Sequence, residues 1–184
     1  MADAPADGKP AYNARLGTHV VTFGDDGVIP NSRCPLVVRQ GAMTPDADDP
    51  AATFERVFAK NGWTNSWRDG VFDYHHYHST AHEVLGIASG SATLRFGGER
   101  GETFGVSAGD VIVIPAGVAH ACIRASDDFC CVGAYDGGRD YDILRDDPKQ
   151  IATARERIAA LPLPGADPVD GESGPLIKLW QAAG

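Results

Sequence analysis

The sequence predicts an all-β domain, a sandwich or barrel, with short helices before and after it. From Trp63 to Tyr135, short runs rich in β-branched and aromatic residues alternate with glycine turns. Many short strands at regular spacing are typical of sandwiches and barrels. A chain of 184 residues suits a single domain with its own hydrophobic core.

Before the barrel, the sequence predicts β-strands at 18–23 and 34–39 and a helix at 51–60. Phe54, Val57 and Phe58 fall on one face of that helix at positions i, i+3 and i+4. The barrel core, 63–135, carries eight candidate strands, at 63–68, 71–78, 83–88, 92–96, 102–106, 111–115, 119–125 and 129–135.

The remaining segments flank this core. Residues 1–16 are interpreted as an N-terminal arm, and 148–160 as a helix that begins at Pro148. The tail is rich in proline and glycine, and its apolar end, 176–180, is expected to pack back on the barrel. The sequence thus predicts one domain over 1–184, with a C-terminal helix and packed tail at 148–184.

Composition narrows the classes of partner. Lys and Arg total 16 and Asp and Glu total 25, so the net charge is −9, with no basic cluster. This argues against a nucleic acid or an anionic membrane as partner. The absence of a long apolar run or a signal peptide indicates a cytoplasmic protein, in which the four cysteines are expected to be reduced.

Two stretches contain residues with ligand chemistry. The first runs from Gly70 to Gly90 and holds His76, His78 and Glu83; the second runs from Gly109 and holds Pro115, Gly117 and His120. Two histidines at i and i+2 point to the same face of a strand. A third histidine and a glutamate from other strands can close around one metal ion, and this donor set suits divalent Mn, Fe, Co, Ni or Zn.

The spacings resemble the two motifs of the cupin superfamily, G(X)5HXH(X)3-4E(X)6G and G(X)5PXG(X)2H(X)3N. The first fits at every position; the second departs at its end, where Arg124 replaces asparagine. The flanks resemble the uncharacterised single-domain YjlB-type cupins. The resemblance implies an RmlC-like double-stranded β-helix, or jelly-roll barrel. It also implies that His76, His78, Glu83 and His120 bind one metal ion at the barrel mouth.

Strand parity adds candidate substrate contacts. Glu83 begins an inward row that continues with Leu85 and Ile87. Tyr74 shares parity with the histidine pair, and Arg124 shares parity with His120. An inward arginine beside a metal favours a carboxylate or other anionic substrate. The alternative is that Arg124 is a salt-bridged structural residue.

Two further histidines leave the ligand set open. His75 and His82 have the parity opposite to His76 and Glu83, so both are expected to face away from the site. A β-bulge that shifts the register would instead let His82 replace one of the named ligands.

The leading functional hypothesis is a divalent-metal-dependent enzyme that acts on a small polar or anionic molecule, of the oxygenase, decarboxylase or isomerase type that the resemblance implies. The sequence assigns no catalytic residue. The alternative is a binding or sensing cupin that uses the metal as a ligand clamp. The predicted partners are a small molecule and a second copy of the chain, paired through the strand at 18–23.

Overall fold

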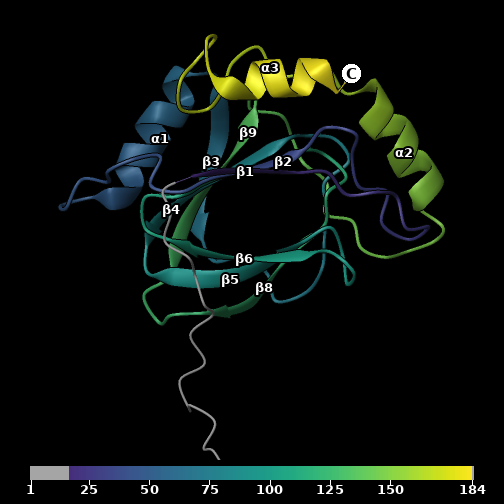
Figure 1. Ribbon diagram of the computed structural model, residues 1–184, viewed down its shortest axis with the longest axis horizontal. Coiled ribbons are helices and arrows are strands. Elements are labelled where there is room, and N and C mark those ends of the chain that lie inside the picture. Colours follow the sequence, from purple (N-terminus) through teal and green to yellow (C-terminus); the bar gives the residue numbers. More distant parts are fainter. Residues whose placement is uncertain (1–16, 184) are drawn as a thin grey trace, which may run out of the picture.

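The computed structural model describes residues 17–183, and the predicted arm at 1–16 lies outside the described residues. Two antiparallel sheets lie face to face as layers, which confirms the predicted jelly-roll class (Figure 1). In spatial order, the larger sheet contains β1 Thr18–Val21, β2 Leu36–Arg39, β7 Val111–Ile114, β4 Glu83–Ser89, β9 Cys130–Asp136 and β3 Trp63–Asp69. The smaller sheet contains β6 Glu102–Ser107, β5 Ser91–Phe96 and β8 His120–Ala125.

The space between the sheets is filled by apolar side chains. Leu85 and Ile87 of β4 are buried there against Leu94 and Phe96 of β5. Successive side chains of a strand point to opposite faces, so the expected inward row that begins at Glu83 is confirmed for its two apolar members. This row leads from the hydrocarbon core up to Glu83 at the end of β4.

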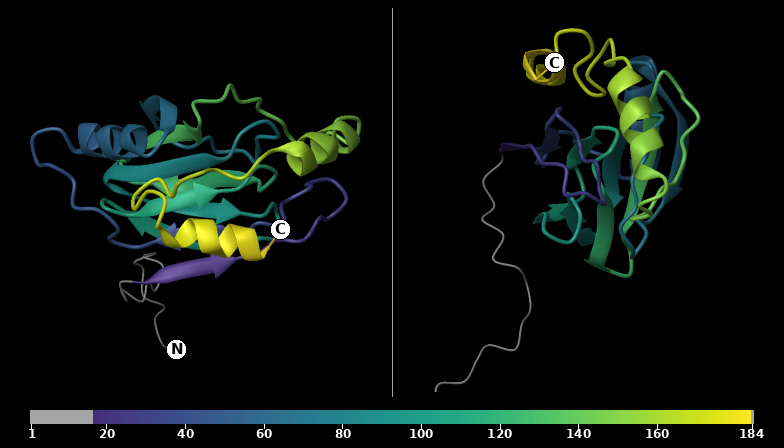
Figure 2. Two further views of the ribbon diagram at one scale, coloured as in Figure 1. Left: turned by 90° about the horizontal axis from the view of Figure 1, so that it is seen from above. Right: turned by 90° about the vertical axis from the view of Figure 1, so that its right-hand side faces the viewer.

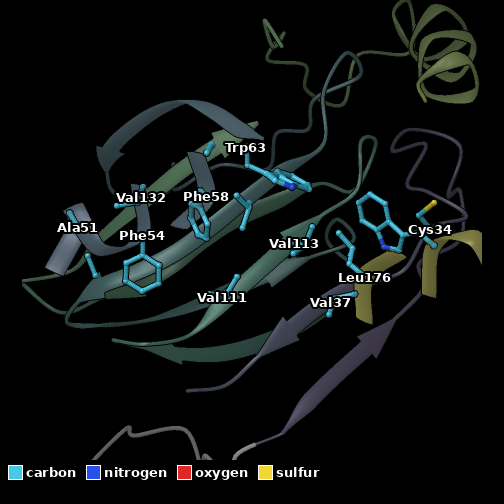
Figure 3. Packing of buried hydrophobic residues seen from close by; sticks show 14 residues of the cluster. Cys34, Val37, Ala51, Phe54, Phe58, Trp63, Val111, Val113, Val132 and Leu176 are labelled. Atoms are coloured by element: carbon cyan, nitrogen blue, oxygen red, sulfur yellow. The ribbon is translucent and has the colours of Figure 1, made fainter. Parts of the chain in front are cut away.

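A second cluster covers the outer face of the larger sheet. It joins α1 Pro50–Lys60 and α3 Pro175–Ala182 to strands β2, β4, β7 and β9 (Figure 3). Phe54 of α1 lies so close to Gly86 of β4 that a Cβ atom added there would stand 2.2 Å from the Phe54 ring. Glycine at this position therefore lets the helix approach the strand closely.

The C-terminal segment contains more helix than the sequence predicts. Helix α2, Ile151–Ala160, occupies most of the expected range, but α3 lies inside the segment expected to be a packed tail rich in proline and glycine. Pro175 is compatible with the first turn of a helix, where its missing N–H has no intrahelical partner. Leu176 and Trp180 of α3 are buried, which confirms that the apolar end of the tail packs on the barrel.

The three described helices lie at separate places around the sheets, as the view from above shows (Figure 2). Between residues 17 and 183, no helix combines the length and apolar character that crossing a bilayer requires.

The expected strand at 71–78 is wrong. The segment is irregular, with isolated bridges from His76 to His120 and from Tyr77 to Leu144. It does not continue along one neighbouring strand, because its hydrogen bonds go to two different parts of the chain. This irregular segment carries two of the predicted ligands.

Candidate metal centre

The four predicted ligands come from three elements and meet at one end of the barrel. His76 and His78 belong to the irregular segment between β3 and β4, Glu83 is the first residue of β4, and His120 is the first residue of β8. The backbones of His76 and His120 exchange two hydrogen bonds, of 3.2 and 2.9 Å. That exchange places their side chains next to each other.

The turn before His120 depends on glycine. Gly117 has φ +95°, and a Cβ atom there would stand 2.2 Å from the carbonyl oxygen of Asn31. Its N–H donates a 2.8 Å hydrogen bond to the carbonyl of His78. Gly117 thus connects the turn that leads into β8 with the segment that carries the other histidines.

The ligand atoms form a compact, buried group. Donor nitrogens of His76, His78 and His120 all lie within 4.8 Å of one another. Glu83 Oε2 is 3.3 Å from His78 Nε2 and 3.2 Å from His120 Nε2. All four residues are at most 5% exposed, so water does not compete freely for these atoms.

Each histidine of this group has its Nδ1 atom near a backbone carbonyl. The partners are Tyr74 for His76 at 3.3 Å, Asp142 for His78, and Val118 for His120 at 3.2 Å. An Nδ1–H donated to a carbonyl leaves Nε2 with its lone pair free, which is the tautomer that binds a metal ion.

Two buried atoms in the group test whether a metal ion fits. His78 Nε2 and Glu83 Oε2 have no hydrogen-bond partner among the described residues. A buried polar atom without a partner is costly. Here the two atoms lie 3.3 Å apart, beside the imidazole of His120, and a divalent ion bound by both would satisfy them. The residues present therefore fit a metal ion.

The electrostatics favour the ligand forms of His76 and Glu83, but not that of His78, whose proton a metal ion would have to displace. Burial, together with the neighbouring His120 and His78, lowers the pKa of His76 to about 3. Burial alone would raise the pKa of Glu83, but His78 and His120 outweigh it and hold the pKa below its usual range. Burial alone would lower the pKa of His78, and the Glu83 carboxylate turns the net shift upward. A neutral imidazole and an ionised carboxylate are the forms that bind metals.

The segment that follows β9 holds the irregular ligand segment in place. Tyr77 and Leu144 exchange two backbone hydrogen bonds of 2.9 Å. The carboxylate of Asp142 accepts from the backbone N–H of Ser79 at 2.6 Å and from its hydroxyl. These hydrogen bonds hold the ligand segment in place, as pairing with a neighbouring strand does in the regular parts of the barrel.

Glu83 is oriented by a pair of aromatic side chains. The Tyr135 hydroxyl donates to Glu83 Oε1 at 2.9 Å and accepts from Trp67 Nε1 at 2.9 Å. Tyr135 lies directly opposite Glu83 in the β4–β9 pair. One carboxylate oxygen is thus held by Tyr135, and the other, Oε2, faces the histidines.

A cavity of about 210 Å³ opens beside the ligand group. It is smaller than the roughly 300–1,000 Å³ of sites for drug-sized ligands. Its lining consists of the four ligands and mostly apolar or aromatic residues: Trp67, Arg68, Asp69, Gly70, Val71, Phe72, Leu85, Tyr135, Tyr141 and Ile143. The ligand group is therefore accessible to a small molecule.

The expected inward orientation of Arg124 is wrong. Leu94 of β5 pairs with Cys122, but Thr93 pairs with Arg124, so β8 contains one extra residue, Ile123, at this point. The extra residue reverses the parity of the strand. Cys122 packs against the inner core, whereas Arg124 is exposed and its Nε donates to the Thr93 hydroxyl at 3.2 Å.

Tyr74, the other candidate substrate contact, does not line the cavity. Its ring stacks on Phe72 at 4.9 Å, and the Arg145 guanidinium lies 4.3 Å from the Tyr74 ring centre. Phe72 does line the cavity. Tyr74 therefore supports a wall residue from behind, and its carbonyl orients His76.

The two remaining histidines near the motif lie outside the ligand group. His75 Nε2 is 3.5 Å from Glu99 Oε1, and His75 does not line the cavity. His82 Nδ1 accepts a 2.9 Å hydrogen bond from the Ala116 N–H, and its ring lies 4.7 Å from that of Trp180. His82 thus faces the outer core under α3, in agreement with its parity.

Some residues around the site have no sequence signal that identifies them. Tyr135 and Asp142 are separated from the residues they hold by more than fifty positions, as in the pairs Tyr135–Glu83 and Asp142–Ser79. Only the pairing of β4 with β9 and the path of the chain after β9 bring them there. Trp67 carries a weak signal, since a tryptophan inside a barrel strand packs or lines a pocket.

Comparison with known proteins agrees with this geometry. A family model described as a cupin domain matches residues 69–132, the part that contains all four ligand positions. A curated relative, the uncharacterized protein YjlB of Bacillus subtilis strain 168, is 42% identical over 164 residues. The alignment covers 89% of this chain and 96% of that protein. The chain therefore belongs to the cupin family, as a protein of the YjlB type.

Solved structures with a similar fold are more distant. Acireductone dioxygenase from Bacillus anthracis, with a cadmium ion in its active centre, is 18% identical at a TM-score of 0.38, over 71% of this chain and 84% of that one. A variant of oxalate decarboxylase from Bacillus subtilis is 19% identical at a TM-score of 0.34, over 60% of this chain and 22% of that one. At these identities and TM-scores the matches identify no activity.

Proposed function

We propose that this protein is a divalent-metal-dependent enzyme acting on a small molecule that enters the cavity beside His76, His78, Glu83 and His120. The observation that carries the proposal is the convergence of two orphaned buried atoms, His78 Nε2 and Glu83 Oε2, on the other imidazoles. Buried polar atoms without partners at a cavity mark a functional site.

A bound divalent ion would supply Lewis acidity toward a substrate oxygen, or a place for O₂ beside the substrate. The chain's own residues do the rest. The three backbone carbonyls at the Nδ1 atoms hold the imidazole tautomers, and Tyr135 holds Glu83 Oε1. The donor set, three imidazoles and one carboxylate, suits Mn, Fe, Co, Ni or Zn.

The first test is the metal content of protein purified without chelators. We expect one divalent ion per chain in the wild type and a strong loss in His76→Ala and His120→Ala, with unchanged far-UV circular dichroism. The matched control is His75→Ala, which removes a neighbouring imidazole outside the cavity and should keep the metal. Full metal content in His76→Ala and His120→Ala would refute the proposed site. The metal found then limits the chemistry to be screened for turnover.

A non-catalytic role as a small-molecule binding or sensing protein is the second candidate. One observation favours it: the cavity offers few groups that could act as a general acid or base. Among the residues that line it, Asp69 is the only carboxylate besides Glu83. Tyr135 does not supply a base, because burial and the nearby Glu83 raise the pKa of its hydroxyl and keep it protonated. Turnover of a small molecule by the metal-loaded protein supports the enzyme; saturable binding of that molecule without turnover supports the sensor.

We also infer a homodimer and a cytoplasmic location. Among residues 17–183, β1 pairs only with β2 and forms an edge of the larger sheet, with Val20 45% exposed. An unpaired, apolar sheet edge is suited to pairing with another strand. Light scattering at micromolar concentration should give twice the chain mass, and Val20→Lys should give the monomer. A monomeric wild type would contradict the dimer and leave the metal site untouched.

A further inference from the structure

The mouth of the metal-site cavity is unusually apolar for an exposed surface. Six large hydrophobic side chains are exposed in residues 17–183, and three of them, Phe72, Tyr141 and Ile143, line this one cavity. Their exposed fractions are 47%, 39% and 46%. Single exposed apolar residues need no explanation, but a group of them around a cavity marks a binding surface.

Two aromatic stacks make the walls of this mouth rigid. On one wall, Phe72 stacks on Tyr74 at 4.9 Å with an interplanar angle of 11°. On another, Tyr141 stacks on Tyr135 at 4.2 Å with an angle of 18°. Exposed rings that are already held by stacking lose little conformational freedom when a ligand packs against them. The walls are therefore prepared for contact with an apolar group.

The charged side chains of the lining do not select an anion. Arg68 is the only cationic side chain among the lining residues. Its guanidinium is committed to Glu55 at 2.7 and 2.8 Å and to Asp49 at 3.1 Å. Arg124 faces the other side of β8. The polar end of a substrate must therefore be recognised at the ligand group, at the bottom of the cavity.

We propose that the substrate is a small amphiphilic molecule: an oxygen-bearing end that meets the metal site, and an apolar body about the size of one ring that packs between Phe72, Tyr141 and Ile143. The inference rests on the proposed metal site and adds the class of substrate. It replaces the expected preference for a small polar anion, because the cavity provides apolar walls and its only Lys or Arg side chain, Arg68, is already paired with carboxylates.

Two hydroxamates with the same chelating group test this proposal. Benzohydroxamic acid carries a phenyl ring, and acetohydroxamic acid carries a methyl group. Each is titrated into cobalt-loaded protein, and the change in the visible cobalt absorption gives the dissociation constant. Burial of the ring should make the benzohydroxamate bind about 10- to 100-fold more tightly. Comparing this affinity ratio between variants removes the intrinsic difference between the two chelators.

Variants of the exposed wall residues test whether contacts at the cavity mouth cause the difference between the two hydroxamate affinities. Phe72→Ala and Ile143→Ala should each lower the affinity ratio by about threefold or more and leave acetohydroxamate binding unchanged. Both side chains are exposed, so the fold should tolerate their loss. Ile123→Ala is the matched control, because Ile123 is 49% exposed but lies outside the cavity. Its ratio should equal that of the wild type.

The outcomes separate the two proposals. If both hydroxamates bind with equal affinity, or if the ratio survives in Phe72→Ala and Ile143→Ala, the apolar substrate class is refuted and the metal site stands. If cobalt does not bind to the wild-type protein, the proposed metal site is refuted, and with it the substrate class that rests on it.

Discussion

The Tyr135 hydroxyl donates a 2.9 Å hydrogen bond to Glu83 Oε1 across the β4–β9 pair, at the end of the barrel where the ligand atoms meet. The same hydroxyl accepts from Trp67 Nε1. This arrangement holds the carboxylate from behind, so that Oε2 faces His78 and His120.

Tyr135→Phe should therefore weaken metal binding by about 10- to 100-fold, since partners behind a metal ligand contribute that much to affinity. The measurement is competition with a chelator of known affinity. Tyr77→Phe is the control, because the buried Tyr77 hydroxyl has no hydrogen-bond partner among the described residues. Equal metal affinity in Tyr135→Phe and Tyr77→Phe would contradict a positioning role for Tyr135.

Arg124→Gln should leave the affinity for small carboxylates unchanged. Arg124 shares the outer face of the smaller sheet with Thr93 and does not reach the cavity. Binding is measured by titration calorimetry of the metal-loaded variant against the wild type. A drop of tenfold or more in carboxylate affinity would show that the arginine reaches the substrate in solution.

Gly86→Ala should lower the free energy of unfolding by about 1–3 kcal/mol, because the new Cβ atom overlaps the Phe54 ring in a tightly packed contact. In a Phe54→Ala background the same substitution should cost less, since the obstructing ring is gone. Gly165→Ala is the control, since no atom lies within 4 Å of a Cβ built there. Urea unfolding of the four proteins in the cycle measures the difference.

Asp110 should make the stability of the folded protein depend on pH, and the direction of the dependence follows from its pKa shift. Burial raises the pKa of its carboxyl, although the carboxylate accepts hydrogen bonds from the Gly41 and Ser107 N–H groups. The folded state then binds the proton more readily than the unfolded state. The stabilisation from this group is complete below the unfolded pKa and is lost as pH rises through the folded pKa.

The test compares wild type with Asp110→Asn. As the pH falls from 7 toward 4, the unfolding free energy of the wild type should increase relative to that of the variant. Because other carboxyl groups titrate alike in both proteins, the difference isolates Asp110. A difference that stays constant with pH, or that moves in favour of the variant, would contradict the raised pKa.

The sequence predicts the barrel from its local strand and turn patterns, and the meeting of the four candidate ligands from the resemblance of their spacing to the two cupin motifs. Strand parity placed Leu85 and Ile87 correctly, since β4 is regular there. The same rule fails at Arg124, because the extra residue Ile123 in β8 can be recognised only from its pairing with β5. It also fails for 71–78, whose hydrogen-bond partners lie on two distant segments.

The residues that hold the site in place cannot be predicted from local sequence patterns. Tyr135 faces Glu83 because β9 pairs with β4, and nothing in either segment encodes that choice of neighbour. Helix α3 is short and is stabilised by the burial of Leu176 and Trp180 against the outer face of the larger sheet, so its own sequence gives a weak signal.

The positions of the four candidate ligands would make the proposed metal centre a connection between the two sheets. Glu83 belongs to the larger sheet and His120 to the smaller one, and His76 belongs to the segment between β3 and β4 that bridges to His120. An ion held by all three would fasten the open end of the sandwich, so every ligand bond would also resist separation of the layers. Unfolding would then release the ion, so the melting temperature should rise with the concentration of free metal. At a concentration one hundred times the dissociation constant, the bound ion adds about 2.7 kcal/mol to the free energy of unfolding. The protein's resistance to heat would thus report on the supply of its own cofactor.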